Sequence, residues 1–442
     1  MKLMRLTVLL LAALLLAGPV LGAGEWAERR HDSQRTGAID GRGNMPSIEE
    51  KWEYGPVYDS FGWNFVGDVD GDGNNEVVCT GDTSVEVLDG SSGESVWSYE
   101  TGEHTYLSGL VRTQDGYDIM LGSFGPYAVL HYGASSPLWE NITLHRYEWV
   151  GISYGAGEPY GIAIVPGTAV IAFSMSDAHI IWNMGMPLSD MNAVISANGD
   201  IIVYGSLNGE GLLKEISRDG VEKWTVSGDF TGRKLFTGDI NGDSRPEILL
   251  ASLFGYTCFD STGAKLWNIS FQWADDNADI SVNTDTATIY EGKGLVMEDI
   301  GGYLYFIGGD GNIIWKRAME RTTTYPILAD VDGDGEKEII AARGETSTEI
   351  ICLSSGDGSE EWNYTVRYGK PASPIIAADT DSDGNLELLM SVSGDDGAKI
   401  ICLDTASADE EPAVPGFTAY MVTASLALAF LMVWGRRRLK TL

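Results

Sequence analysis

Four copies of a nine-residue acidic pattern constrain this chain more than any other feature. Each copy carries oxygen-bearing side chains at its first, third, fifth and ninth positions, and a short apolar run follows it. We name the copies loop A (residues 68–76), loop B (239–247), loop C (330–338) and loop D (379–387). Their side chains at these positions are Asp68, Asp70, Asp72, Glu76, Asp239, Asn241, Asp243, Glu247, Asp330, Asp332, Asp334, Glu338, Asp379, Asp381, Asp383 and Glu387.

Alternate residues of a tight loop can direct their carboxylates at one centre, and a hard cation with many oxygen ligands suits such a centre. The last acid stands at position 9, not 12, and β-rich runs flank the loop, so the pattern is not an EF-hand. A solvated Asp/Gly turn is the alternative for any single copy. Four copies at matched phase favour Ca²⁺ loops inside β-hairpins. Loop B departs furthest, because Asn241 replaces an Asp and Ser244 a Gly.

Tryptophan gives the chain a period. Eight tryptophans recur at intervals of 42 to 48 residues, most of them shortly after a turn containing Gly or Asp. A period in the forties, filled with short strands and Gly-rich turns, is typical of propeller blades. Tryptophans at a fixed repeat phase are expected to be packing anchors between blades. They are Trp52, Trp97, Trp139, Trp182, Trp224, Trp267, Trp315 and Trp362.

The repeats predict an all-β fold, an eight-bladed β-propeller spanning residues 24–407. Seven full intervals separate the first and last tryptophans, and a partial unit of three strands follows at residues 375–403. A lone Trp-bearing strand at residues 50–54 precedes them. If this strand completes the last blade, the ring closes by pairing its two ends and leaves few open strand edges.

Both ends of the chain carry targeting signals. Residues 1–23 have Lys2 and Arg5 ahead of an apolar run, and then small residues, as a secretory signal peptide does. Residues 418–434 are apolar and within the length range of a transmembrane helix. The basic tail at residues 435–442 would stay cytoplasmic, which places the propeller outside the cell.

The segment before the apolar stretch carries a sorting motif. Residues 408–417 form an acidic linker that ends in Pro415, Gly416 and Phe417. This order of motif, helix and basic tail resembles the PGF-CTERM signal of archaeal surface proteins, which implies removal of the helix by an archaeosortase and attachment of a lipid. A plain single-pass anchor is the alternative. Both predict a protein tethered at the outer face of the cell membrane.

Composition excludes one class of partner. With 64 acidic residues against 29 basic ones the formal charge is −35, so the chain will not bind nucleic acid through phosphate contacts. Four cysteines allow a disulfide in an exported protein, although small buried thiols are the favoured interpretation (Cys79, Cys258, Cys352 and Cys402). Three glycosylation sequons begin one or two residues after a repeat Trp, on the expected outermost strands: Asn141, Asn268 and Asn363.

Two propeller families resemble this combination. The acidic loops are similar to the FG-GAP (integrin-α-like) repeat, in which calcium loops lie between the first two strands of a blade. The opening residues 26–37, and turns such as Gly-Ala-Lys-Leu before Trp267, resemble quinoprotein-like (PQQ-like) propellers. The two resemblances cover most of residues 26–404. Quinoprotein dehydrogenases use a vicinal Cys pair, an Asp base and a calcium at the quinone. No two cysteines are adjacent here, so the resemblance implies fold and calcium but not redox activity.

The sequence offers no catalytic constellation. The five histidines have no metal-ligand spacing, and no nucleophile motif occurs. His145 and Arg146, near Trp149, either line a pocket or belong to a polar loop. We therefore favour a non-enzymatic, calcium-binding cell-surface propeller that serves as an adhesion or interaction scaffold for an envelope protein or polysaccharide. The alternative is an exported calcium-dependent enzyme, a polysaccharide lyase or a quinoprotein dehydrogenase.

Overall fold

The computed structural model describes the propeller region of the chain. The chain forms two compact units, Met1–Thr405 and Ala406–Leu442, and all but one residue of the second lies outside the described part. The predicted signal peptide, linker, sorting motif, transmembrane helix and tail therefore lie outside the described residues. Those residues are 25–406 without 29, 33, 58–63, 82, 103, 123–126, 142–143, 145–146, 155–157, 272–286, 300–301, 320–323, 345–346, 368 and 396.

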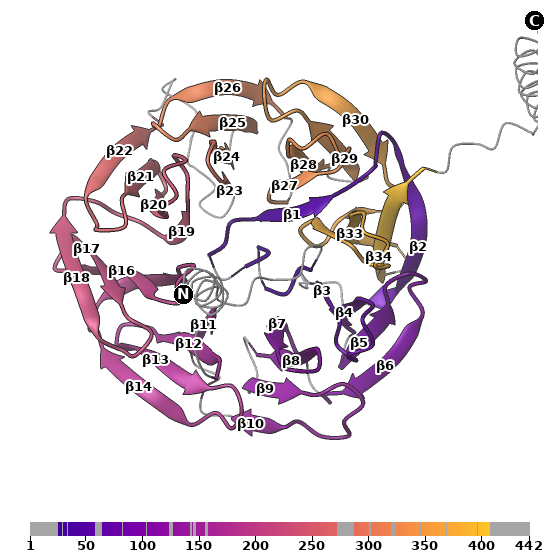
Figure 1. Ribbon diagram of the computed structural model, residues 1–442, viewed down its shortest axis with the longest axis horizontal. Helices are drawn as coiled ribbons and strands as arrows, with labels where there is room; N and C mark the ends of the chain where they lie inside the picture. The colour runs from indigo at the N-terminus through magenta and orange to yellow at the C-terminus, as the bar shows by residue number, and fades with distance from the viewer. Residues whose placement is uncertain are drawn as a thin grey trace, which may run out of the picture. The chain divides into compact units, whose positions relative to one another are not determined.

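Eight sheets of mainly antiparallel strands stand around a central axis (Figure 1). Every regular element of the described residues is a strand, and none of these residues lies in a helix able to span a bilayer. Blades 1 to 6 have four strands each: blade 1, β3 (Phe65–Gly67), β4 (Glu76–Thr80), β5 (Ser84–Asp89) and β6 (Ser95–Glu100); blade 2, β7 (Leu107–Arg112), β8 (Tyr117–Leu121), β9 (Tyr127–Leu130) and β10 (Trp139–Asn141); blade 3, β11 (Glu148–Ser153), β12 (Tyr160–Val165), β13 (Ala169–Ser174) and β14 (Ile180–Gly185); blade 4, β15 (Ser189–Ile195), β16 (Ile201–Leu207), β17 (Glu210–Ile216) and β18 (Glu222–Gly228); blade 5, β19 (Lys234–Gly238), β20 (Glu247–Ser252), β21 (Gly255–Phe259) and β22 (Lys265–Ser270); and blade 6, β23 (Thr288–Tyr290), β24 (Gly294–Glu298), β25 (Tyr303–Gly308) and β26 (Ile313–Ala318).

The last two blades include strands from the start of the chain. Blade 7 consists of β27 (Ile327–Asp330), β28 (Glu338–Arg343), β29 (Glu349–Leu353) and β30 (Glu360–Thr365), extended by β1 (Ala38–Arg42), and blade 8 consists of β31 (Lys370–Pro371), β32 (Ile376–Ala378), β33 (Glu387–Gly394), β34 (Gly397–Thr405) and β2 (Ile48–Val57).

Burial along the strands follows their place in the blade. The second strands, such as β4 and β20, are almost continuously apolar and buried, because both of their faces pack against neighbouring blades. The outermost strands, such as β22 and β30, alternate between exposed and half-buried residues. This alternation is the period-2 pattern of a strand with one face in water. The core of the protein is therefore the set of interfaces between successive blades.

The N-terminal strand closes the ring. β2 pairs antiparallel with β34, with Trp52 opposite Cys402, and it forms the outermost strand of blade 8. The strand expected at residues 50–54 lies within β2. The prediction of an eight-bladed propeller closed by the N-terminal Trp-bearing strand is therefore confirmed.

The repeat tryptophans are the anchors between blades. Each lies on the outermost strand of its sheet, and five of them donate their indole N–H to a backbone carbonyl in a turn of the next blade. These bonds, of 2.6 to 2.9 Å, are Trp52 to Gly90, Trp139 to Met175, Trp182 to Arg218, Trp267 to Gly309 and Trp315 to Ser355. The period in the sequence is thus the period of the blade-to-blade contact.

A glycine in the receiving turn makes this contact possible. Gly311 has φ +81°, and a Cβ there would lie 2.7 Å from Cδ2 of Trp267. Only glycine adopts this backbone conformation without strain and also leaves room for the indole. Gly93, Gly220, Gly263 and Gly358 lie in the same way, with positive φ, against the tryptophan of the preceding blade.

Residues 26–42 lie inside the ring, where Figure 1 shows the indigo start of the chain. Backbone bonds join Trp26 to Val66 of blade 1 and Ala27 to Leu110 of blade 2. Glu28 accepts a backbone hydrogen bond from Ile152 of blade 3.

The same segment reaches the remaining five blades. Arg35 donates to Asn192 of blade 4 and to the carbonyl of Leu235 in blade 5. Thr36 accepts from Ile289 of blade 6, β1 pairs parallel with β27 of blade 7, and Arg42 accepts from Leu386 of blade 8. One short segment therefore bonds to every blade, an arrangement that the repeat pattern did not predict.

All four cysteines are free and buried in the sheets. Cys79, Cys258, Cys352 and Cys402 are each 0–1% exposed, and burial raises the pKa of each thiol. Of the two sequence interpretations, buried thiols are confirmed and a disulfide is not formed.

We predict that Gly311→Ala lowers the free energy of unfolding by about 1–3 kcal/mol, because the methyl group strains the backbone and displaces the Trp267 indole. The matched control is Gly133→Ala. Gly133 has φ +74° but nothing within 4 Å of its would-be Cβ, so only the backbone cost of about 1 kcal/mol remains. Chemical denaturation of both variants measures the difference. Equal losses would contradict the packing role of the turn glycine.

We also predict a pH-dependent effect of Glu28, which is 5% exposed. Burial and the charge of Asp32 raise its pKa from 4.5 to about 8, against opposing contributions from Ile152 and Arg35. The unfolded chain ionises above pH 4.5 while the folded carboxyl stays protonated, so its destabilising effect grows from there up to about pH 8. Glu28→Gln should therefore raise the melting temperature at pH 8 and change it little at pH 5. The control is Glu94→Gln, at an exposed carboxylate; a gain independent of pH would refute the role of Glu28.

Candidate metal centres

The acidic loops occupy equivalent places in four blades. Loops A, B, C and D connect the first and second core strands of blades 1, 5, 7 and 8. Because every blade is an up-and-down meander, these connections all lie on one face of the ring. Loops A and D are neighbours, and the Asn75 amide donates to the carbonyl of Asp379 at 2.7 Å.

The first carboxylate shapes each loop. In loop A, Asp68 accepts the backbone N–H groups of Gly71 at 2.7 Å and Gly73 at 3.1 Å. The equivalent Asp239, Asp330 and Asp379 also accept two backbone N–H groups each. The Asp at the first position therefore stabilises the turn, because its carboxylate accepts backbone N–H groups that have no other partner in the tight loop.

The ninth-position glutamate closes the loop from the second strand. Glu76 is 5% exposed, and its Oε2 accepts the backbone N–H of Val69 at 2.9 Å. Glu247, Glu338 and Glu387 accept the corresponding backbone N–H at 2.7 to 2.9 Å. The strand register therefore carries a buried carboxylate to the base of each loop.

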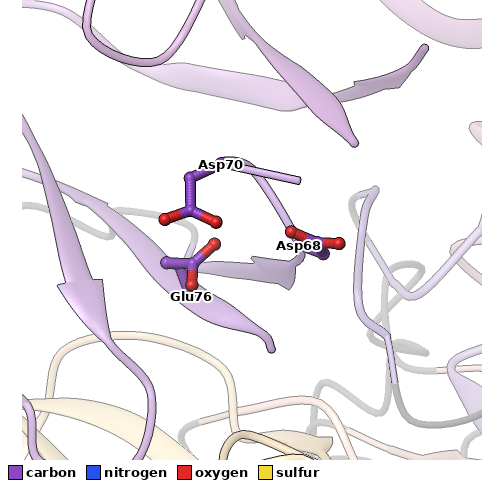
Figure 2. A group of neighbouring side chains, drawn as sticks. All are labelled: Asp68, Asp70 and Glu76. Atoms are coloured by element: carbon purple, nitrogen blue, oxygen red, sulfur yellow. The ribbon is translucent and has the colours of Figure 1, made fainter. Parts of the chain in front are cut away.

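Three loops bring three carboxylates together. The side chains at positions 1, 3 and 9 of loops A, C and D offer oxygen atoms that all lie within 4.8 Å of one another. Figure 2 shows this group in loop A, where the carboxylate of Asp70 faces that of Glu76. The groups are Asp68, Asp70 and Glu76; Asp330, Asp332 and Glu338; and Asp379, Asp381 and Glu387.

The fifth-position carboxylates lie outside these groups in the described residues. Asp72 accepts the backbone N–H of Asn74 at 2.8 Å, and Asp243, Asp334 and Asp383 accept the equivalent N–H two residues further on. In this structure they stabilise the turn. Of the four ligand positions expected from the sequence, three converge.

The carboxylates in these groups repel one another. Burial, together with the charges of Asp70 and Asp68, raises the pKa of Glu76 to about 8 despite the hydrogen bond from Val69. Burial has the same effect on Glu338, whose pKa also rises to about 8. A nearby cation would favour the ionised form of each group. The donor set consists only of oxygen and is rich in carboxylate, which is the chemistry that Ca²⁺ prefers.

Lys51 was not anticipated as part of an acidic loop. It lies on the closing strand β2, and its ammonium is 2.8 Å from Asp381 of loop D. The two residues are 330 positions apart, and no local pattern marks the lysine. Only closure of the ring brings them together.

The remaining candidates fall into two sets. His131 contacts Asp118 at 2.8 Å and His179 contacts Asp177 at 2.5 Å, while His145 and Arg146 lie outside the described residues. The sequon residues Asn268 and Asn363 are exposed on the outermost strands β22 and β30, and Asn141 is half-buried at the end of β10.

Comparison with known proteins identifies the fold. No protein-family model matches the chain, and no curated protein matches it. The quinohemoprotein alcohol dehydrogenase ADHIIG of Pseudomonas putida HK5 matches with a TM-score of 0.61 at 10% identity, over 86% of this chain and 80% of that one. The quinohemoprotein alcohol dehydrogenase of Comamonas testosteroni matches with a TM-score of 0.57 at 11% identity, over the same shares of the two chains.

A third solved structure shares the architecture. BamB from Moraxella catarrhalis matches with a TM-score of 0.51 at 11% identity, over 80% of this chain and 99% of that one. The chain has the propeller fold of quinoprotein dehydrogenases and BamB. At this level of identity the likeness concerns the fold alone.

We predict that the effect of Asp332→Asn on the melting temperature depends on calcium. In chelator the substitution should raise the melting temperature, because it removes one of three crowded carboxylates. Addition of calcium should then raise the melting temperature of the variant less than that of the wild-type chain, because the loop C centre has lost a charged ligand. Thermal unfolding in both conditions tests this, with Asp357→Asn, at an exposed turn carboxylate, as the control. Parallel shifts of the two proteins would contradict a cation centre in loop C.

Proposed function

We propose that this chain is a calcium-stabilised propeller at the outer cell surface, and that it serves as an adhesion or interaction scaffold for an envelope protein or polysaccharide. The observation that carries the proposal is the convergence of three carboxylates in each of loops A, C and D on one face of the ring. Bound Ca²⁺ would neutralise these groups and hold that face in one conformation. A rigid face of loops on a stable scaffold is suited to recognition.

The two ends of the sequence support the location. A secretory signal at residues 1–23 would export the chain, and the segment from Pro415 to the basic tail would tether it, with the helix retained or exchanged for a lipid. Exposure of Asn268 and Asn363 suits a glycoprotein, because a glycan on the outer strands would project into solvent.

The fold likeness to quinohemoprotein dehydrogenases supports the enzyme alternative. The residues at the centre of the ring weigh against it. Trp26 and Glu28 are buried there, and residues 26–42 bond to all eight blades, so a quinone on this axis would have to displace the chain itself. The vicinal cysteine pair of that family also has no counterpart, because all four cysteines are separate and buried in strands. The residues present therefore do not fit a quinone, and we favour a scaffold.

The test is binding by the full-length chain, with each partner class offered separately. Proteoliposomes carrying the chain are incubated with purified envelope polysaccharide, or with purified envelope proteins, in calcium and again in chelator. We expect calcium-dependent retention of one class, and its loss in a variant carrying Asp70→Asn, Asp332→Asn and Asp381→Asn. The matched control carries Asp177→Asn, Asp310→Asn and Asp357→Asn, at exposed turn carboxylates outside the acidic loops.

Three outcomes would contradict the proposal. Retention unaffected by chelator would remove calcium from the function. Absence of retention by a folded chain would remove the scaffold. Turnover of an acidic polysaccharide, or alcohol oxidation after incubation with the quinone, would establish the enzyme alternative.

A further inference from the structure

The four acidic loops differ in what faces the buried glutamate. In every loop the Oε2 atom of this glutamate accepts a backbone N–H from position 2. Its other oxygen faces position 3, and this second contact separates the loops into two kinds.

In loop B an amide of the chain itself meets the glutamate. The Nδ2 of Asn241 donates to Oε1 of Glu247 at 2.9 Å. The orientation of this amide is determined, because its Oδ1 accepts the backbone N–H of Asp243 at 2.8 Å. The nitrogen must therefore point at Glu247, into the place where a cation would bind.

In loop D an ammonium from the other end of the propeller domain occupies the equivalent place. Lys51 Nζ lies 2.8 Å from Asp381 Oδ2, 3.0 Å from Asp404 Oδ2 and 3.9 Å from Glu387 Oε1. Glu387 is 0% exposed, and its Oε1 has no hydrogen-bond partner among the described residues, so the nearby ammonium is what compensates this buried oxygen. The side chain of Lys51 is itself only 18% exposed.

Loops A and C have no such compensation. Their third positions are Asp70 and Asp332, which add negative charge beside Glu76 and Glu338. In the part of the chain that the structure describes, no ion pair with Lys, Arg or His involves these four carboxylates. Each group thus gathers three carboxylates that no ion pair among the described residues balances; the Arg42 guanidinium at loop C donates to the carbonyl of Gly333, not to a carboxylate.

We propose that loops A and C bind a divalent cation, whereas loops B and D do not, because the Asn241 amide and the Lys51 ammonium take its place. The inference rests on the calcium binding proposed above and deepens it. It lowers the expected number of bound ions to two, from the four loops of the sequence and the three carboxylate groups of loops A, C and D. It also gives loop D a separate role, because an ammonium on β2 reaches this loop only when the ring is closed.

The consequence is a closing blade that does not depend on calcium. Loop D joins β32 to β33, and Lys51 belongs to the strand that completes the same blade. The strand pairing that joins the two ends of the domain therefore also brings the ammonium that neutralises loop D. Removal of calcium would loosen loops A and C while blade 8 stays sealed.

The test counts calcium ions bound by the full-length chain, by equilibrium dialysis followed by atomic emission. We expect two ions for the wild-type chain, three for Lys51→Met, three for Asn241→Asp and four for the double variant. Lys51→Met keeps an unbranched side chain of similar length and removes only the ammonium. Asn241→Asp supplies the missing carboxylate without touching the closing strand, so it remains informative even if Lys51→Met fails to fold.

The matched control is Lys399→Met. Lys399 pairs with Glu53 at 2.9 Å across the same β2–β34 contact, away from the loop D carboxylates. This variant makes the same charge change and also removes an ion pair from the closing strands, so it should still bind two ions. Three ions with Lys399→Met would mean that net charge, not the position of Lys51, controls binding, and would overturn the inference.

Two further results separate this inference from the proposed function. A wild-type chain that binds four ions, or variants that bind no more than the wild type, would overturn the division of the loops and leave calcium binding intact. A wild-type chain that binds no calcium, while it remains folded, would overturn the proposed function and the inference with it.

Discussion

The pairing of β2 with β34 is the contact on which the rest of this molecule depends. It joins segments more than three hundred residues apart, and an open ring would expose the edge of β34 and the tryptophan-binding turn of blade 1. The paired strand brings Trp52 to Gly90, as the other anchors do in their own blades, and it brings Lys51 to loop D. Closure therefore completes the packing pattern and a charge balance at once.

A second constraint acts from the inside of the ring. Residues 26–42 bond to every blade, and they include the buried Glu28 and Arg30. Arg30 donates to Thr288 and lies 4.9 Å from the ring of Tyr325, so its charge is held by oxygen and aromatic groups. Because the segment directly precedes β2, one continuous stretch of chain both fills the centre and seals the perimeter. The segment therefore links the blades that carry the acidic loops to those that do not.

The acidic face combines strict local geometry with variable charge balance. In all four loops the first position accepts the backbone N–H of position 6 and the ninth position accepts that of position 2, so the hairpin forms whatever stands at position 3. Position 3 and its neighbours then decide whether the loop is crowded with charge or balanced within the chain. Asp70, Asn241 and Asp381 hold the same position in three different loops. Asp70 lies beside the Glu76 carboxylate, Asn241 donates a hydrogen bond to Glu247, and Asp381 pairs with the Lys51 ammonium.

Most of the architecture could be predicted from local sequence patterns. The Trp period gave the number of blades and the packing anchors between them, and the Asp-rich spacing located the hairpin loops, because each of these features acts over a few residues and repeats. The lone strand at residues 50–54 also indicated closure, since it had no blade of its own. The convergence of positions 1, 3 and 9 followed from spacing, whereas the turn-stabilising contacts of Asp72 and Asp334 did not, because backbone donors compete for the same carboxylates.

What the sequence by itself determined is therefore the repeat: all-β blades, their number, their anchors and the positions of the acidic loops. Only the tertiary structure decided what lies opposite each loop and what fills the ring. The place of Lys51 beside Asp381 and the path of residues 26–42 across eight blades depend on contacts between distant segments. Such contacts leave no periodic trace in the chain, because each is made once and only after the ring has closed.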